Sequence, residues 1–372
     1  MGHDVLAQPQ RDRWLERRGL RAERGRAASP KRDRGPRAKA SRRVRWTIGF
    51  PYGVRTDATT ERSPGNDEEG RAVPIRLVEN FRALFYAPFY AAELIGAYET
   101  EGVAVRRLAS SDPERTAAAL ADGSADVMWG GPLRAMRTLD RDPSAGVVCF
   151  ADAVARDPFF IIGAAPHPGF RLADLSGVRL ATVAEVPTPW VCLQHDLRLA
   201  GVDPATVGRV SGPSMAENAR ALREGRLDAV QLFQPHAEDL LASGAGHLWY
   251  AAATRGPTAY TTFVTRREVL AARREELVRL TRALHRALRW VASASEDEIG
   301  GVLASLFLAV QPALIGAAVA RYRALGLYAA TPVIARDGVA WLHDAMRAAK
   351  MLSRDIPFDE VVDTSIAREA AT

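Results

Sequence analysis

Residues 119–126, Ala-Leu-Ala-Asp-Gly-Ser-Ala-Asp, are echoed in form by residues 221–228, Ala-Leu-Arg-Glu-Gly-Arg-Leu-Asp. Each stretch ends a helical pattern at a glycine, enters a β-rich run through an aspartate, and is followed by a helix that begins with proline. Glycine is the usual stop signal of a helix because it takes the left-handed conformation at little cost. The echo favours two lobes of similar construction. The alternative is that both stretches show ordinary helix–strand chemistry.

Outward from these stretches, β-rich runs alternate with helical patterns, which is typical of parallel α/β architecture. We expect strands over 75–79, 103–108, 126–129 and 146–150, with helices over 88–97, 113–121 and 132–139 between them. The same order starts again with strands over 178–183, 207–210, 228–232 and 247–251 and helices over 189–200, 215–223 and 235–242. The remainder, 267–372, is predicted to be largely helical.

Two further segments, 157–163 and 260–265, are predicted to be extended and to lie where the chain passes between the lobes. Two such crossings make a hinge that lets lobes close on a ligand, although both segments also fit ordinary sheet strands. The expected domains are a first lobe over 73–160 and 261–372, which includes the C-terminal helices, and a second lobe over 161–260. Residues 1–72 are predicted to be a disordered basic arm and an acidic linker.

The positive charge of the chain belongs to that arm. The 372 residues have a formal net charge of +6, from 50 Lys and Arg against 44 Asp and Glu. Residues 1–45 hold 15 of the basic and 5 of the acidic residues, so residues 46–372 carry a net charge of −4. A nucleic-acid surface needs its basic residues clustered on a folded face. We therefore expect no nucleic-acid binding through the folded body.

Signals of cellular location are incomplete. No run of about 18 apolar residues is present, so no membrane span is predicted. Ser41–Trp46 resembles a twin-arginine export signal, but the apolar stretch after it contains Pro51 and no small-residue cleavage pattern. The alternative is a disordered arm, or an upstream extension outside the working protein. Cys149 and Cys192 both lie in apolar segments, which predicts buried thiols and no disulfide framework.

Motifs for catalysis, metal binding or cofactor binding are missing. The seven histidines share no ligand spacing with one another or with either cysteine, so no metal site is expected. There is no G-x-S-x-G elbow and no phosphate-binding loop. The lysines are Lys31, Lys39 and Lys350 alone, which argues against a Schiff-base lysine and pyridoxal phosphate in an interlobe cleft. We expect no enzyme activity and no cofactor.

Aromatic and polar residues gather instead where strands are predicted to end. In open α/β sheets, ligands sit beyond the carboxyl ends of the strands, and flat apolar walls with a few polar groups suit a small aromatic or heterocyclic solute. The candidate ligand-binding residues are Glu79, Asn80, Phe85, Tyr86, Trp129, Gly130, Asp152, Thr182, Trp190, Gln231 and Phe233. The alternative for each aromatic side chain is a place in the core, which we favour for Phe89.

Three motifs carry a resemblance to a known family. They are Ala87–Glu93 (APFYAAE) with Gly96–Val105 (GAYETEGVAV), Gly123–Asp126 (GSAD), and Ile356–Ser365 (IPFDEVVDTS). In this order, and over about 75–365, the chain resembles the NMT1/THI5-like solute-binding proteins. The resemblance implies a type II periplasmic-binding fold, with two α/β lobes, a two-crossing hinge and C-terminal helices. It also implies a monomer, periplasmic or at the cell surface, that captures a small molecule for an ABC permease.

The resemblance also bears on the ligand. Members that bind thiamin-type pyrimidines often show Asp-Trp after the first strand, where this chain has Glu79-Asn80, so a carboxylate remains for an amino-heterocycle. In the branch that makes the thiamin pyrimidine, the sacrificed histidine falls at the position of Tyr86. We expect an ABC-importer protein that captures a small aromatic or heterocyclic (thiamin-pyrimidine-like) solute or an organic anion in its interlobe cleft. The alternative is a cytoplasmic enzyme or ligand sensor of the same fold, such as a pyrimidine-precursor synthase-like protein.

Overall fold

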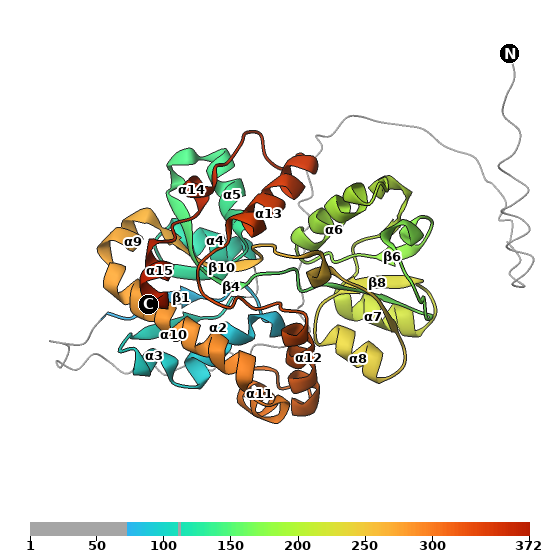
Figure 1. Ribbon diagram of the computed structural model, residues 1–372, viewed down its shortest axis with the longest axis horizontal. Helices are drawn as coiled ribbons and strands as arrows, with labels where there is room; N and C mark the ends of the chain where they lie inside the picture. The colour runs from blue at the N-terminus through green and yellow to red at the C-terminus, as the bar shows by residue number, and fades with distance from the viewer. Residues whose placement is uncertain (1–72, 111–112) are drawn as a thin grey trace, which may run out of the picture. The chain divides into compact units, whose positions relative to one another are not determined.

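The computed structural model describes residues 73–110 and 113–372, with the backbone alone at 113 and 114 (Figure 1). The predictions for the basic arm, the acidic linker and the twin-arginine segment lie outside these residues. Over the described part, two five-stranded sheets are covered by helices. The predicted two-lobed α/β fold is confirmed, and each sheet forms the centre of one lobe.

The first sheet has the strand order β2-β1-β3-β10-β4. Its strands are β1 (Ile75–Val78), β2 (Val105–Leu108), β3 (Val127–Gly130), β4 (Val147–Val154) and β10 (Thr261–Arg266). β1 runs parallel to β2 and β3, whereas β10 pairs antiparallel with β3 and β4. The chain therefore returns to the first sheet, through β10, after the second lobe is complete.

The second sheet has the strand order β7-β6-β8-β5-β9. Its strands are β5 (Phe160–Gly163), β6 (Arg179–Ala181), β7 (Gly208–Val210), β8 (Ala229–Leu232) and β9 (His247–Ala251). β6 runs parallel to β7 and β8, and β5 pairs antiparallel with β8 and β9. The arrangement matches that of the first sheet strand for strand.

The aspartate that closes each echoed stretch makes the same contact in both lobes. Asp126 accepts hydrogen bonds from the backbone N–H of Arg76 at 2.8 Å and from its guanidinium at 2.6 and 3.0 Å. Asp228 accepts the same three bonds from Arg179, at 3.0, 2.7 and 3.0 Å. Each pair fastens an incoming strand to the central parallel strand of its sheet, which supports a repeated construction of the lobes.

Helices fill the connections between strands. Those of the first lobe are η1 (Leu84–Tyr86), α2 (Ala87–Leu94), α3 (Ala97–Thr100), α4 (Pro113–Ala121), α5 (Pro132–Arg141) and η2 (Pro143–Ala145). Those of the second lobe are η3 (Leu172–Leu175), α6 (Thr188–Leu199), η4 (Pro204–Thr206), α7 (Met215–Arg223), α8 (His236–Ala242) and η5 (Ala252–Arg255). The C-terminal helices are α9 (Arg267–Ala272), α10 (Arg274–Ser293), α11 (Glu296–Leu303), η6 (Ala304–Leu306), α12 (Pro312–Ala324), α13 (Arg336–Ala348), α14 (Phe358–Val361) and α15 (Ser365–Ala371). Over the described residues, none of these helices has the length and apolarity needed to cross a bilayer.

Several predicted boundaries shift by one to four residues, and two of the differences have a clear physical reason. The helix predicted over 88–97 ends at Leu94, because Gly96 takes a φ of +71° and a separate turn, α3, follows it. β4 continues to Val154, past the predicted end at 150, because β10 pairs along its length. Only a partner strand more than a hundred residues away in the chain makes that extension favourable.

The two segments predicted to form the hinge are mostly strands, since 157–163 contains β5 and 260–265 lies almost wholly in β10. The links that pass between the sheets are the stretches 155–159 and 252–260. The predicted domain boundaries stay a proposal, which the sheet membership of β5 and β10 supports. The C-terminal helices touch both lobes, because α12 contacts α8 and α13 contacts α6.

A buried guanidinium joins the two links. Arg255 in the second link donates to Asp157 in the first link at 2.8 Å and to Asp196 of α6 at 2.7 Å. Its side chain is 8% exposed and its guanidinium carbon lies 4.0 Å from the ring centre of Trp341 on α13. Four segments that are distant in the sequence therefore converge on one buried cation.

Asp152 of β4 is a buried carboxyl group that, unlike Asp157 and Asp196, has no cationic partner in an ion pair within the part of the chain that the structure describes. Its side-chain Oδ1 has no hydrogen-bond partner among the described residues. Burial raises the pKa of Asp152 to about 7, because the charged form loses its hydration. The folded protein therefore holds a proton on this carboxyl group under mildly acidic conditions.

The Arg255→Met variant tests the buried ion pairs. Its free energy of unfolding should fall by about 3–5 kcal/mol, because Asp157 keeps a buried charge without a partner. Urea denaturation followed by circular dichroism measures the change. The control is Arg336→Met, since Arg336 pairs with Asp359 in solvent and such pairs add little. If Arg255→Met loses no more free energy of unfolding than this control, the buried ion pairs of Arg255 do not stabilise the fold.

Asp152 predicts a pH dependence of stability. The pKa of Asp152 is about 3.9 in the unfolded chain and about 7 in the folded protein. Between these two pH values the folded state binds more protons than the unfolded state. The free energy of unfolding should therefore fall as the pH rises through this window. Asp152→Asn should remove that part of the fall. Urea denaturation measures the free energy of unfolding of both proteins at about pH 5 and pH 8. The variant should gain in stability relative to the parent at the higher pH. An equal difference at both values would rule out this titration.

Candidate functional site

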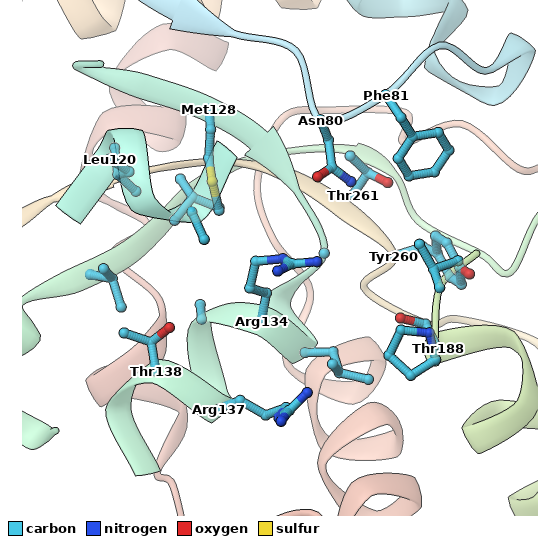
Figure 2. Close-up of a pocket in the computed structure, with 18 of the residues that line it drawn as sticks. Asn80, Phe81, Leu120, Met128, Arg134, Arg137, Thr138, Thr188, Tyr260 and Thr261 are labelled. Carbon is cyan, nitrogen blue, oxygen red and sulfur yellow. The ribbon is translucent and has the colours of Figure 1, made fainter. Parts of the chain in front are cut away.

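A cavity of about 530 Å³ opens where the two lobes meet (Figure 2). The residues of the first lobe that line this interlobe part include Asn80, Phe81, Phe85, Tyr86, Arg134 and Thr261. The second lobe and the links to it contribute Phe159, Val186, Pro187, Thr188 and Tyr260. Small-molecule sites are clefts of about this volume. The cavity is therefore the candidate ligand site.

The chain enters the cavity directly after β1. There the side-chain amide of Asn80 donates to the Tyr86 hydroxyl, at 3.3 Å. Burial raises the pKa of Tyr86 above its usual value, while the bond from Asn80 and the Arg134 cation act to lower it. Tyr86 is thus an uncharged phenol at neutral pH, held in place by Asn80.

Aromatic side chains form a continuous wall on this side of the cavity. The ring centre of Tyr86 lies 4.3 Å from that of Phe85 and 5.4 Å from that of Phe81. Tyr260 lies edge-on to Phe85 at 6.1 Å. Phe233 of the second lobe packs behind the wall, 5.2 Å from Phe85. Such rings offer a broad apolar surface to an organic ligand.

Two helices begin at the cavity. α5 starts after Gly131 and α6 starts after Pro187, and neither N-cap residue makes a side-chain hydrogen bond to its helix. Gly131, Pro187 and Thr188 line the cavity. A side chain at Gly131 would crowd the link between the lobes, because a Cβ there would lie 3.1 Å from the Tyr260 carbonyl oxygen. The first N–H groups of a helix lack partners within it, and its dipole favours negative charge at this end.

One face of α5 adds cations to the cavity wall. Arg134, Arg137 and Arg141 all line the cavity, with the spacing of a single helix face. Figure 2 shows the Arg134 side chain extending from α5 into the cavity. Within the described lining, Asp142 is the one carboxylate, and it accepts hydrogen bonds from Ser144. The cavity therefore carries a positive excess that suits an anion.

Of the residues predicted from the sequence, Asn80, Phe85 and Tyr86 line the cavity. Trp129 does not: it is fully buried and stacks on Phe89, with the ring centres 4.9 Å apart. The structure therefore places Trp129 in the core of the first lobe, as it does Phe89. Gly130, which ends β3, and Phe233 are also outside the lining.

Glu79 lies in a buried cluster of cations beside the cavity. Its carboxylate accepts hydrogen bonds from Arg82 at 2.8 Å, from Arg107 at 2.9 Å and from the Tyr90 hydroxyl at 2.7 Å. Its side chain is 1% exposed and does not line the cavity. The carboxylate predicted for an amino-heterocycle is thus bound by the chain itself, where it fixes the turn between β1 and α2.

The remaining predicted residues also fall outside the cavity lining. Thr182 accepts a hydrogen bond from the Arg209 guanidinium at 2.9 Å, and that guanidinium lies 4.4 Å from the ring centre of Trp190. Gln231 donates to a backbone carbonyl of α6 at 3.0 Å. Asp152 is buried in β4. These polar groups face neighbours within their own lobes.

Sequence reasoning missed the arginines and Tyr260. The spacing R-x-x-R-x-x-x-R over 134–141 was available, but it is equally typical of a solvated helix face. The prolines after Gly131 and Pro187 mark helix starts that follow strands, and this signal locates both N-termini. No local pattern places Tyr260 at the same cavity as Asn80, because its position depends on the return of the chain to the first lobe.

Comparison with known proteins adds to this geometry. Residues 85–297 match the family described as NMT1/THI5 like. YtlA of Bacillus subtilis (strain 168), whose name describes a binding protein, is 23% identical over 307 residues, or 82% of this chain and 92% of YtlA.

Solved structures share the fold. The periplasmic aliphatic sulphonate binding protein SsuA of Escherichia coli has 16% identity and a TM-score of 0.63, covering 77% of this chain and 96% of SsuA. The desulfurization enzyme DszB has 15% identity and a TM-score of 0.59, covering 80% of this chain and 98% of DszB. The predicted periplasmic-binding fold is confirmed. Because the family match spans more than half of the residues, the chain belongs to the NMT1/THI5-like family.

Proposed function

We propose that this chain is a solute-binding protein that captures an organic anion with an aromatic or other apolar group between its lobes and delivers it to an ABC importer. Family membership and the two-lobed fold support the binding role. The observation that carries the anionic class is the meeting of Arg134 with two uncapped helix N-termini at one cavity. SsuA, which has this fold, is named for a sulphonate, itself an organic anion.

Hydrogen-bond donors dominate the centre of the cavity. The guanidinium of Arg134 can donate, as can the N–H groups of Leu133 and Thr188 in the first turns of α5 and α6, where Pro132 and Pro189 have none, and sulfonate or carboxylate oxygens accept. Such charge-assisted bonds are about twice as strong as neutral ones. An aminopyrimidine needs an acceptor, and Glu79 is taken up by Arg82 and Arg107. These contacts favour the organic anion over the thiamin-pyrimidine-like ligand.

The aromatic wall accounts for the organic part of the ligand. Phe81, Phe85, Tyr86 and Tyr260 line the cavity and offer ring faces and edges. Each square ångström of apolar surface removed from water stabilises the complex by about 25 cal/mol. The cations thus select the charge of the ligand, and the rings add affinity for its carbon skeleton.

We favour binding without chemistry over an enzyme or ligand sensor of the same fold. Within the described residues, the cavity lining holds no Cys, His or Lys that could act as a nucleophile or form a Schiff base. Burial raises the pKa of Cys149 to about 12, so this thiol stays protonated. The similarity to the enzyme DszB is a similarity of fold and does not itself imply a shared activity. Recovery of chemically unaltered ligand after incubation with the protein distinguishes binding from turnover.

The setting proposed with this role is periplasmic or at the cell surface, with an ABC permease as the partner. The name of SsuA, which describes a periplasmic binding protein, supports this setting. We also propose a monomer, because residues of a single copy line both sides of the cavity.

A ligand screen on the full chain tests the anionic class. The panel contains alkyl and aryl sulfonates, the matching carboxylates, the neutral alcohols and amides of the same skeletons, and aminopyrimidines. Anions should raise the melting temperature in proportion to the logarithm of their concentration, and neutral analogues should not. If neutral analogues stabilise the protein as well as the anions do, or if nothing in the panel does, the proposal fails.

The Arg134→Gln variant tests the residue at the centre of the cavity. Affinity for a sulfonate found in the screen should fall about 10- to 100-fold, because a hydrogen bond to a charged group contributes about 1.5–3 kcal/mol. Isothermal titration calorimetry measures the change. Arg282→Gln on an exposed face of α10 is the control and should bind as the parent does. Unchanged binding by a folded Arg134→Gln variant would remove Arg134 from the site.

A further inference from the structure

The repeated construction of the lobes lets one position be compared in both. Arg76 and Arg179 are equivalent, because the aspartate that closes each echoed stretch binds them in the same way. The match continues three residues later. The backbone N–H of Glu79 donates to the carbonyl that ends β2 at 2.8 Å, and that of Thr182 donates to the carbonyl that ends β7 at 2.9 Å. Thr182 therefore stands in the second lobe where Glu79 stands in the first.

The next strand of each sheet carries an equivalent arginine. Arg107 of β2 and Arg209 of β7 each pair in register with the residue that follows the matched arginine. The guanidinium carbon of Arg107 lies 6.0 Å from the ring centre of Tyr90 on α2. That of Arg209 lies 4.4 Å from the ring centre of Trp190 on α6. The two lobes thus build the same pair of an arginine and an aromatic ring.

The partners of these two guanidinium groups differ. Arg107 donates to Glu79 at 2.9 Å and also pairs with Glu93. Arg209 donates to the uncharged hydroxyl oxygen of Thr182 at 2.9 Å, and it forms no ion pair with any described residue. Three residues after its aromatic ring, α6 has a leucine where α2 has Glu93. The second lobe keeps the cation but replaces both carboxylates with uncharged side chains.

This replacement has an electrostatic consequence. Burial acts to lower the pKa of Arg107, but its hydrogen bond to Glu93 and the charges of Glu93 and Glu79 outweigh burial and raise that pKa. Partial burial lowers the pKa of Arg209, and no carboxylate among the described residues opposes the shift. A cation that has lost part of its hydration is stabilised by a nearby opposite charge. An anion beside Arg209 would therefore supply an interaction that Arg107 already has.

The shape of the group suits a carboxylate. The side chain of Arg209 is exposed and its Nε is bound to Thr182, so its two terminal nitrogens remain as donors. The half-buried ring of Trp190 covers one face of the guanidinium, which limits its rotation before a ligand arrives. Two parallel N–H groups of a guanidinium match the two oxygens of a carboxylate.

We propose that Arg209, Trp190 and Thr182 form a second anion site, which binds a small carboxylate. This carboxylate takes the role that Glu79 and Glu93 have in the first lobe. The three residues of the site lie outside the lining of the interlobe cavity, so the inference does not rest on the proposed function. One lobe thus contains its counter-charges in its own sequence, and the other obtains one from solution.

Tryptophan resonances in the full chain test this site. The chain has seven tryptophans, and Trp190→Phe identifies the indole N–H signal of Trp190 in a nuclear magnetic resonance spectrum of the isotope-labelled protein. Acetate, titrated at constant ionic strength against chloride, should shift this signal along a saturating curve. No shift, or an equal shift with chloride, overturns the inference.

The Arg209→Gln variant tests the cation. Acetate binding should weaken about 10- to 100-fold, because hydrogen bonds to a charged group are lost. Arg226→Gln is the matched control, since Arg226 is exposed in the same lobe and pairs with Glu224, and it should respond as the parent does. A response that persists in Arg209→Gln but disappears in Arg134→Gln belongs to the interlobe cavity. That outcome contradicts the second site and leaves the proposed function standing.

The Thr182→Glu variant rebuilds the arrangement of the first lobe. Its carboxylate should pair with Arg209, so the response of Trp190 to acetate should disappear. Thr182→Gln, of similar size but without charge, is the matched control and should keep the response. Acetate binding that matches the parent in a folded Thr182→Glu variant contradicts the inference. Because Thr182 is fully buried, Arg209→Gln decides the question if neither variant of Thr182 folds.

Discussion

The buried guanidinium of Arg255 is the constraint on which the geometry of the cavity depends. By binding Asp157 and Asp196 it ties both links between the lobes to α6. Burial raises the pKa of Asp196 to about 6, and the Arg255 cation opposes the shift. The same α6 brings its N-terminus to the cavity wall, opposite α5. One internal cation therefore fixes α6, and with it one of the two helix ends at the cavity, to both links.

In the site that we propose, recognition is divided among different physical effects. Helix ends and the arginines of α5 supply a fixed field for negative charge, which needs no reorganisation when a ligand arrives. Aromatic rings from the segment after β1 and from the second link supply apolar surface. The carboxylate of Glu79 is paired with two neighbouring arginines, which reduces its repulsion of an anion. Separate elements of the fold thus provide the positive charge and the apolar surface.

Local patterns in the sequence predicted most of the fold but little of the site. The stretches ending in Asp126 and Asp228 marked matching helix-to-strand junctions, because glycine stops and strand entries are local chemistry. Whether an aromatic residue faces a cavity depends on packing between distant segments. Trp129 thus lies in the core, and Tyr260 lines the cavity although nothing near it in the sequence marks it. Likewise, Arg107 comes beside Glu79 only when β2 pairs with β1, whereas its other cationic partner, Arg82, is local in the sequence.

The C-terminal helix α12 bears on how quickly a ligand leaves. Arg321 of α12 donates to Glu238 of the second lobe at 2.9 Å, and the Tyr322 hydroxyl accepts the N–H of Gln234 at 2.9 Å and donates to the Pro158 carbonyl at 3.1 Å. Any rotation that parts the lobes must strain or break these bonds. Residence time in the cavity is then governed by the free energy of separating α12 from the second lobe as well as by contacts with the ligand. A transporter that grips this helix would gain control over release without touching the solute.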